Sequence, residues 1–148
     1  MTQQSTVLKV VRSALAVFLG MLASMVSIGL FQVGSTLFFP MPPGLDPNDM
    51  ASLRQYVSKM PTAAFALLGI GYGVGSMIGS FVATALGTNR HMFHGLVIAF
   101  FLLLAGVMNM MAIPHPTWFI IAYPLIVVSA AYLGILSVRR LLPGPLAS

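Results

Sequence analysis

Residues 71–87 read GYGVGSMIGSFVATALG, with a glycine or an alanine at every fourth position. The members of this small-residue ladder are Gly71, Gly75, Gly79, Ala83 and Gly87. Residues four apart share one face of an α-helix, and small side chains there let another backbone approach closely. No charged residue lies between Lys59 and Arg90, so the ladder belongs to an apolar segment. The pattern is typical of a glycine zipper and predicts close helix packing inside a lipid bilayer.

The composition indicates a membrane protein. Of 148 residues, 58% are hydrophobic and 6% are charged, whereas a typical soluble domain has about a quarter charged residues. The net charge of +5 is scattered, and no basic cluster is long enough to follow a nucleic-acid backbone. The chain has no cysteine, which excludes disulfides and thiolate metal sites. We expect one domain whose main partner is the lipid bilayer.

Charged residues and prolines divide the chain into four expected membrane spans. A spanning helix needs about 20 mostly apolar residues. The neutral runs before Asp46 and before Arg90 each hold one span, whereas the run from 91 to 138 is long enough for two. Pro114 and Pro116 interrupt this run, because each removes a helix donor and disfavours helical conformation in the preceding residue. The spans are predicted at about 13–37, 62–87, 91–112 and 117–138.

The basic residues predict the orientation of the spans. With four spans, both termini and the loop near Arg90 lie on one side of the membrane. Five of the seven Lys and Arg residues belong to that side, namely Lys9, Arg12, Arg90, Arg139 and Arg140. Because cytoplasmic segments are enriched in Lys and Arg, both termini are expected in the cytoplasm. The first apolar run is too long for a signal peptide, so we expect it to remain as the first helix.

The loop between the first two spans is expected to hold a short amphipathic helix at about 47–60. Asp46 suits an N-cap, Pro47 the first helical position and Asp49 the positive end of the helix dipole. One helical face then carries the apolar residues Met50, Leu53, Val57 and Met60. The helix is expected on the outer membrane surface or over the bundle, as a lid or as a connector. Two aspartates are too few for a calcium site, which takes about 6–8 oxygens.

Two packing arrangements are open for the ladder. The first span offers matching small residues at Ala16, Gly20 and Ser24. The ladder can therefore pack against the first span of the same chain, or it can form the seam of a homo-oligomer.

Polar side chains inside the spans are costly in hydrocarbon and are therefore candidate site residues. The main candidates are Gln32, Asn109 and His94. Gln32 and Asn109 fall in the outer halves of their spans, where they can hydrogen-bond to each other. His94 lies close to Arg90, so we expect it at the cytoplasmic interface or satisfied within the bundle. No Asp, Glu, Lys or Arg lies deep in a span, which argues against proton-coupled or ion-coupled transport.

The sequence predicts neither a metal site nor a catalytic one. Soft ligands for Cu(I) gather near the end of the third span, at Met108, Met110, Met111 and His115. Methionine also commonly fills gaps in apolar packing, and Pro114 disturbs the helical spacing, so we expect no metal there. The chain has no cysteine, no close carboxylate pair within a span, and no phosphate-binding or nucleophile-elbow motif. No catalytic residue and no cofactor are expected.

Three features together resemble a group of small bacterial inner-membrane proteins with four spans. They are PGLDPND at 43–49, the small-residue ladder, and Asn109 followed by IPHPTWF at 113–119. The resemblance implies a four-span fold in the bacterial inner membrane. That group has no assigned activity, so the resemblance implies no site residue.

Three classes of function are open. The first is a structural or accessory protein that acts through helix contacts, and the lack of buried charge favours it. The second is a small transporter or channel for a neutral or apolar solute, which a water-lined cavity at Gln32, Asn109 or His94 would favour. The third is a membrane enzyme, which a polar pocket around a perturbed histidine would favour.

Overall fold

The computed structural model describes residues 2–46, 48–90 and 92–142, and every regular element in these ranges is a helix. Four helices are long and apolar enough to span a membrane: α1 (Thr2–Phe38), α3 (Thr62–Leu86), α4 (Met92–Ala112) and α5 (Thr117–Leu141). The short helix α2 (Met50–Ser58) joins α1 to α3, and the 3-10 turn η1 (Thr88–Arg90) joins α3 to α4. The predicted all-α fold with four candidate spans is therefore confirmed.

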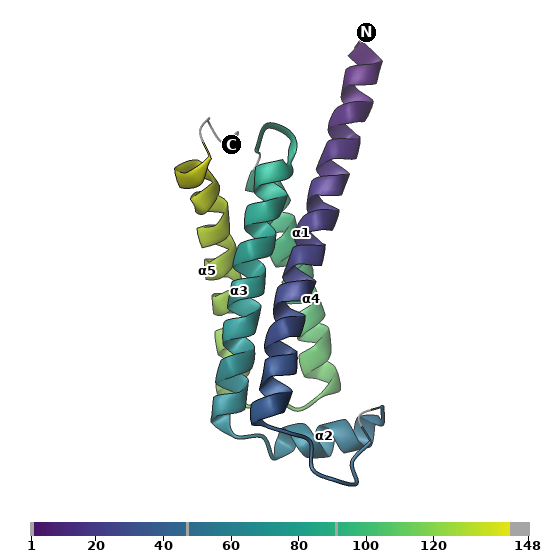
Figure 1. Cartoon of the computed structure of the whole chain (residues 1–148), viewed down its shortest axis with the longest axis vertical. Helices are drawn as coiled ribbons and strands as arrows, with labels where there is room; N and C mark the ends of the chain where they lie inside the picture. Colours follow the sequence, from purple (N-terminus) through teal and green to yellow (C-terminus); the bar gives the residue numbers. More distant parts are fainter. Residues whose placement is uncertain (1, 47, 91, 143–148) are drawn as a thin grey trace.

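The long helices run alternately up and down, so their connections gather at two ends (Figure 1). The α2 end, at the bottom of Figure 1, holds α2 and the link between α4 and α5. The terminal end, at the top, holds the start of α1, the turn η1 and the end of α5. Here α1 rises well beyond the other long helices, because it has 37 residues and they have 21 to 25. At its full length α1 reaches about 55 Å, which exceeds the thickness of a bilayer core, about 30 Å.

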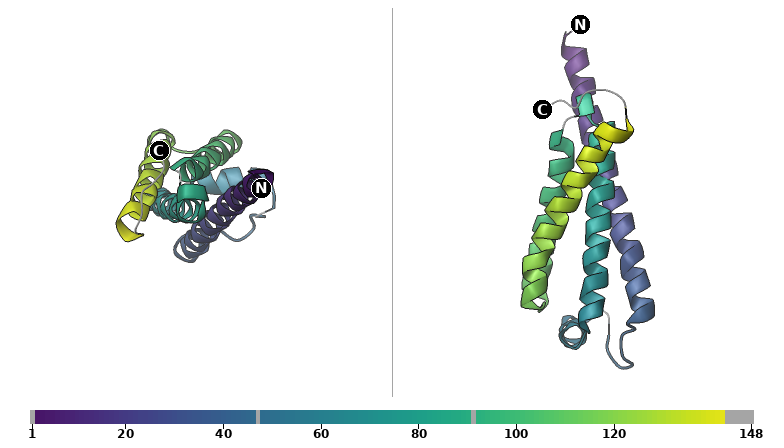
Figure 2. Two further views of the ribbon diagram at one scale, coloured as in Figure 1. Left: turned by 90° about the horizontal axis from the view of Figure 1, so that it is seen from above. Right: turned by 90° about the vertical axis from the view of Figure 1, so that its left-hand side faces the viewer.

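Helix α3 is the centre of the bundle. It packs most extensively against α1 and α5 and also contacts α4. Viewed from above, α3 lies between α1 and α5 (Figure 2). Helix α1 is held mainly by α3, since its contact with α4 is slight.

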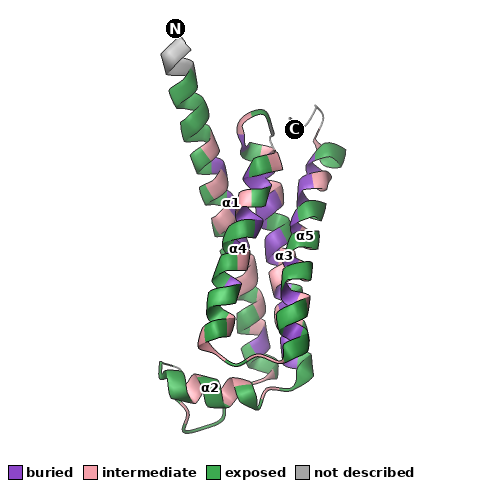
Figure 3. Ribbon diagram, turned by 180° about the vertical axis from the view of Figure 1, so that it is seen from behind, coloured by how far each residue is buried: buried purple, intermediate pink, exposed green. Residues whose placement is uncertain are grey.

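Large apolar side chains cover the outward faces of the helices, which are largely exposed in Figure 3. Phe18, Phe100 and Leu125 are examples, each more than half exposed. Contiguous apolar surface of this extent is unfavourable in water, whereas hydrocarbon solvates it and helices satisfy their own backbone groups there. The four apolar helices therefore indicate a multi-pass membrane protein.

The ladder brings α3 against α1 of the same chain. A Cβ placed on Gly79 would collide with Ser24, and a Cβ placed on Gly75 would lie 2.5 Å from Ile28 Cγ1. Side chains do not approach this closely, so the two helices fit together only because these positions are glycines. The α1 residues expected to oppose the ladder are all buried: Ala16, Gly20 and Ser24.

The seam between α1 and α3 extends over most of the ladder. At the α2 end, a Cβ on Gly71 would lie 2.6 Å from Phe31 Cβ. Toward the terminal end, a Cβ on Gly20 would lie 2.7 Å from Ala83 Cβ. Gly87 makes a different contact, because the space beside it is filled by the ring of His94 from α4.

Glycines also determine how closely α5 approaches α3 and how closely α4 approaches α5. A Cβ on Gly134 would collide with the main-chain carbonyl of Met77, so α5 lies directly against the α3 backbone. A Cβ on Gly95 of α4 would lie 2.5 Å from Ile135 Cγ1 of α5. Each of these helix pairs therefore depends on a glycine at its closest point.

Each of four helix pairs is also joined by a hydroxyl that donates to a backbone carbonyl of the neighbouring helix. These bonds run from Ser24 to Gly75 at 2.9 Å, from Ser76 to Val127 at 2.8 Å, from Ser80 to Gly95 at 3.1 Å and from Tyr123 to Leu102 at 2.5 Å. All four donors are buried. Measured interhelical hydrogen bonds in a membrane average about 0.6 kcal/mol and reach about 1.7 kcal/mol.

Helix α1 begins earlier than the predicted residue 13. The added turns are fastened to the end of α3, where Arg12 Nε donates to the carbonyl of Leu86 at 2.9 Å. The Thr88 hydroxyl donates to the carbonyl of Lys9 at 3.0 Å and lies 2.9 Å from Ser13 Oγ. The last carbonyls of a helix lack intrahelical partners, and a cation is favourable beside them. These contacts hold residues 9–13 of α1 against the end of α3 and the turn η1.

Helix α2 begins later than the predicted residue 47, because Asp49 and not Asp46 is its N-cap. The Asp49 carboxylate accepts from the Ser52 N–H at 2.8 Å, with the extended backbone usual for an N-cap. Asp46 instead accepts from the Asn48 N–H at 2.8 Å, which forms a turn before the helix. Pro47, predicted at the first helical position, lies outside the described residues.

The Gly79→Ala variant should be destabilised by about 1–3 kcal/mol, the usual cost of overpacking a core. The added methyl group would collide with Ser24 and would approach the main-chain carbonyl of Gly20 at 2.6 Å. The free energy of unfolding in mixed micelles, measured by titration with a denaturing detergent, checks this expectation.

Gly29→Ala is the matched control, because a Cβ at Gly29 of α1 meets nothing within 4 Å. Alanine favours helix over glycine by about 1 kcal/mol, so this variant should be as stable as the wild type or more stable. Equal destabilisation of both variants would show that the ladder does not form the tight seam.

Candidate functional site

Polar side chains from all four long helices meet in a cavity of about 120 Å³ at the α2 end. Four of them come from the long helices, namely Gln32 of α1, Tyr72 of α3, Asn109 of α4 and Tyr123 of α5. The fifth, His115, belongs to the link between α4 and α5. Apolar residues complete the wall, including Val57 of α2 and Met60, which follows this helix. We call this space the α2-end cavity. Five polar side chains from the spans and from the α4–α5 link converge there.

Tyr123 forms the inner floor of the α2-end cavity. Its hydroxyl donates to the carbonyl of Leu102 at 2.5 Å. A Cβ on Gly106 would collide with the Tyr123 ring, so glycine at this position admits the ring between α4 and α5. The Tyr72 ring meets the Tyr123 ring edge to face, with centroids 5.0 Å apart. A second ring contact joins Tyr123 to Phe119, with centroids 6.2 Å apart, so the floor is fixed by one hydrogen bond and two aromatic contacts.

Gln32 and Asn109 lie at the rim of the α2-end cavity. Both side chains are exposed although both line the cavity. These two residues therefore line one cavity, but the hydrogen bond expected between them is not observed among the described residues.

His115 is held by the link between α4 and α5. Its Nδ1 lies 2.8 Å from the carbonyl of Ile113, and Nδ1 carries the hydrogen in this bond because a carbonyl only accepts. The imidazole stacks on the ring of Phe119, with centroids 5.6 Å apart and planes 17° apart. Pro114 and Pro116, which end α4 and precede α5, thus bring an imidazole to the cavity wall.

Helix α2 closes the outer side of the cavity and is fastened at two points. Arg54 Nε donates to the carbonyl of Ala112 at 2.9 Å, at the end of α4. The Tyr56 hydroxyl donates to the carbonyl of Phe39, at the end of α1. Partial burial raises the pKa of Tyr56, so this donor keeps its proton at neutral pH. Of the two arrangements predicted for this helix, the one over the bundle is observed.

The N-cap of α2 depends on the ionised form of Asp49. Hydrogen bonds from the backbone and side chain of Ser52 and from the backbone of Ala51 lower the pKa of this carboxyl group. A lowered pKa in the folded state means that the cap is fully present above the ordinary value of 3.8. The contribution is lost only as the pH falls through the lowered pKa.

The lining limits the chemistry of the α2-end cavity. Hydroxyl, amide and imidazole groups can hydrogen-bond a neutral molecule, and the volume equals that of a few waters at about 30 Å³ each. No carboxylate, lysine or arginine is among the lining residues. The cavity therefore lacks the paired acid and base that most hydrolytic reactions use.

The other predicted candidates lie elsewhere. His94 is buried at the terminal end of the bundle, against Gly87, and does not reach the α2-end cavity. Met108 and Met111 are exposed on α4, whereas Met110 and His115 line the cavity. The structure therefore does not bring the soft-ligand cluster together as one set.

Sequence reasoning missed the residues that join the helices by hydrogen bonds. Ser76 and Ser80 lie four residues apart on α3, and neither was predicted as a donor to α5 or α4. The role of Tyr123 in the cavity floor was also missed. A signal was present, since each of these hydroxyls lies deep in an apolar run where it needs a partner.

Comparison of the chain with family models, with curated proteins and with solved structures gives no match.

A cysteine placed in the α2-end cavity should react with a water-soluble maleimide if water fills the cavity. The chain has no native cysteine, so Gln32→Cys gives a single reactive thiol. We expect labelling at least several-fold faster than at Val33→Cys, measured by mass spectrometry in liposomes.

Val33 is the matched control because it follows Gln32 on α1, is 62% exposed and does not line the cavity. In a bilayer its thiol should face hydrocarbon, where the reactive thiolate is disfavoured. Equal labelling of the two variants would contradict a distinct water-filled site.

Proposed function

We propose that the chain is an accessory protein of the bacterial inner membrane that acts through lateral contacts of its helices. The observation that carries this proposal is the use made of four buried hydroxyls, although those of Thr84 and Ser35 have no hydrogen-bond partner among the described residues. Those of Ser24, Ser76, Ser80 and Tyr123 each bond a carbonyl of a neighbouring helix. These groups hold helices together and are not arranged along a path for a solute.

The interior beyond the cavity floor also favours an accessory role over a channel. Ile98, Leu102 and Val127 belong to the buried core between the floor and the terminal end, and each is at most 6% exposed. Permeation of a polar solute requires polar groups or water along its route. Below Tyr123 these core residues are apolar, and the Ser76 and Ser80 hydroxyls at that depth are already bonded to the carbonyls of Val127 and Gly95.

The proposed location rests on charge and on sequence resemblance. The terminal end carries five Lys and Arg residues, whereas both aspartates belong to the α2 end. This asymmetry supports cytoplasmic termini by the positive-inside rule. The resemblance of 43–49 and 113–119 to small bacterial four-span proteins supports the inner membrane.

A homo-oligomer through α3 would need a face other than the ladder, because α1 covers the ladder. The available face lies beside α5, where Gly69 and Gly73 line an apolar groove of about 480 Å³. Ile70 and Met77 are exposed on the same side of α3. We propose this groove as the seam for a second copy, if the chain self-associates.

Binding of a small neutral solute is the second candidate function. The α2-end cavity favours it, because five polar side chains surround one space. Helix α2 would then act as a lid over the cavity, held closed by the bonds of Arg54 and Tyr56. A membrane enzyme has weaker support, since His115 lines the cavity without a carboxylate beside it.

Solute flux separates the first candidate from a channel or transporter. Purified protein reconstituted in liposomes should leave the permeability to glycerol and urea equal to that of protein-free liposomes, measured by stopped-flow light scattering. A rise in permeability that the Gln32→Leu variant abolishes would contradict the accessory role and support the transporter.

Lateral partners are tested by crosslinking in native membranes. A photoreactive amino acid in place of Phe100, which is 61% exposed on α4, should give a discrete heavier adduct. The same amino acid in place of Ile98, which is 0% exposed, should give none and is the matched control. Adducts to lipid alone at Phe100 and at Leu125 would contradict the proposed role.

A further inference from the structure

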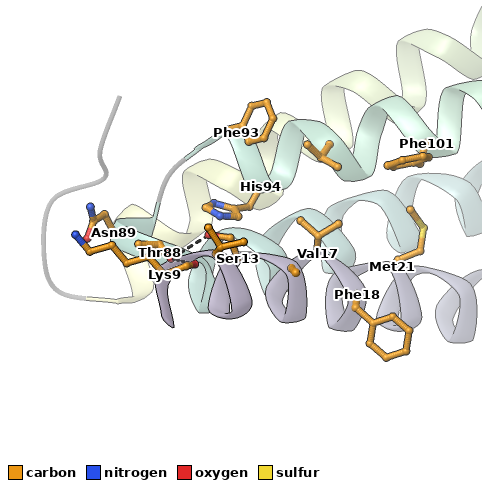
Figure 4. A pocket seen from close by; sticks show the side chains of 13 residues that line it. Lys9, Ser13, Val17, Phe18, Met21, Thr88, Asn89, Phe93, His94 and Phe101 are labelled. Atoms are coloured by element: carbon orange, nitrogen blue, oxygen red, sulfur yellow. Dashed lines mark hydrogen bonds between the residues drawn. The ribbon is translucent and has the colours of Figure 1, made fainter. Parts of the chain in front are cut away.

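An open groove runs between α1 and α4 at the terminal end, with a volume of about 1110 Å³ (Figure 4). It exists because α1 packs on α3 and makes only slight contact with α4. The groove is separate from the α2-end cavity, and the two share no lining residue.

The lining changes character along the groove. Lys9, Thr88 and Asn89 gather at one end in Figure 4, where the turn η1 meets α1. Toward the middle of the bundle the wall is apolar, formed by Val17, Phe18, Met21, Val97 and Phe101. One end is therefore suited to a polar group and the remainder to hydrocarbon.

The length of the groove matches the thickness of one membrane leaflet. Lys9 and Met21 are twelve residues apart on α1, which corresponds to about 18 Å along the helix. Half of the hydrocarbon core of a bilayer is about 15 Å. A lipid chain lying in the groove would therefore have its headgroup near Lys9.

The polar end is preorganised and positively charged. The Thr88 hydroxyl bonds the Lys9 carbonyl and lies beside Ser13 Oγ, which holds η1 against α1 (Figure 4). Lys9 is exposed, so its ammonium group can reach a headgroup. Both aspartates of the chain are at the α2 end, so no side-chain carboxylate competes for Lys9 here.

We propose that this groove binds one anionic phospholipid, with an acyl chain along Val17 and Phe101 and the phosphate beside Lys9. The charge complementarity at Lys9 favours an anionic over a zwitterionic lipid. The apolar length favours a lipid over a soluble anion, which would leave the wall formed by Phe18 and Met21 uncovered. This site goes beyond the proposed accessory function and does not depend on it.

The test compares phosphatidylglycerol and phosphatidylcholine of identical acyl chains. The full-length protein is exchanged into detergent with equal amounts of both lipids, and native mass spectrometry counts the lipids retained. We expect one retained phosphatidylglycerol per chain. Lys9→Gln should lower this retention about fivefold, the effect of one lysine near an anionic headgroup.

Two variants serve as comparisons. Lys59→Gln removes the same charge at the α2 end and should leave retention unchanged. Val17→Trp should lower the retention of both lipids, because the indole would fill the apolar part of the groove. Lys9 and Lys59 are exposed, so neither glutamine variant should disturb the fold.

The following results would overturn the proposal. One is equal retention of the two lipids, and another is an equal effect of Lys9→Gln and Lys59→Gln on this retention. A third is binding of glycerol phosphate alone that is as tight as binding of the lipid, which would indicate a soluble anion site. A dimer that Val17→Trp dissociates would indicate that a second copy occupies the groove.

Discussion

Close approach of α1, α4 and α5 to the backbone of α3 determines the shape of the bundle. In hydrocarbon the hydrophobic effect does not drive helices together, so dispersion contacts and hydrogen bonds must do so. Both fall off steeply with distance, and both are strongest where glycine allows backbones to meet. The carbonyls that accept from Ser24, Ser76 and Ser80 are within reach only at this separation.

The same packing decides which parts of the protein remain available for function. Four buried hydroxyls inside the bundle bond to carbonyls of neighbouring helices, and the polar side chains that line open space lie at the two ends. At the α2 end they surround a small cavity beneath a fastened helix. At the terminal end, α1 diverges from α4 and leaves a groove with a lysine at its mouth. Lateral contact and lipid binding are the activities that this division supports.

Much of the fold was predictable because single physical constraints determine it. The length of the apolar runs predicted the spans. Pro114 and Pro116 predicted the break between α4 and α5, because proline has no backbone N–H to donate within a helix. The ladder indicated a tight face, yet its partner could not be deduced, because a second copy could offer the same small residues. The structure places α1 there.

The remaining features depend on tertiary geometry. Every residue has a carbonyl, so spacing could not show which one Ser76 or Tyr123 would reach. The N-cap of α2 moved to Asp49 because Asp46 bonds Asn48 in a turn of its own. Gln32 and Asn109 were predictable as outer polar residues, but their grouping with His115 depends on how the α4–α5 link folds. The groove follows from the angle of α1, which no local pattern encodes.

The most direct measurement is the free energy of unfolding of serine variants in mixed micelles. Ser24→Ala, Ser76→Ala and Ser80→Ala each remove a bond between helices, whereas Ser27→Ala and Ser137→Ala remove a bond within one helix. If α3 is the centre of the bundle, each of the first three should lose about 0.6–1.7 kcal/mol, and the last two should match the wild type. Equal losses in all five variants would contradict the central position of α3.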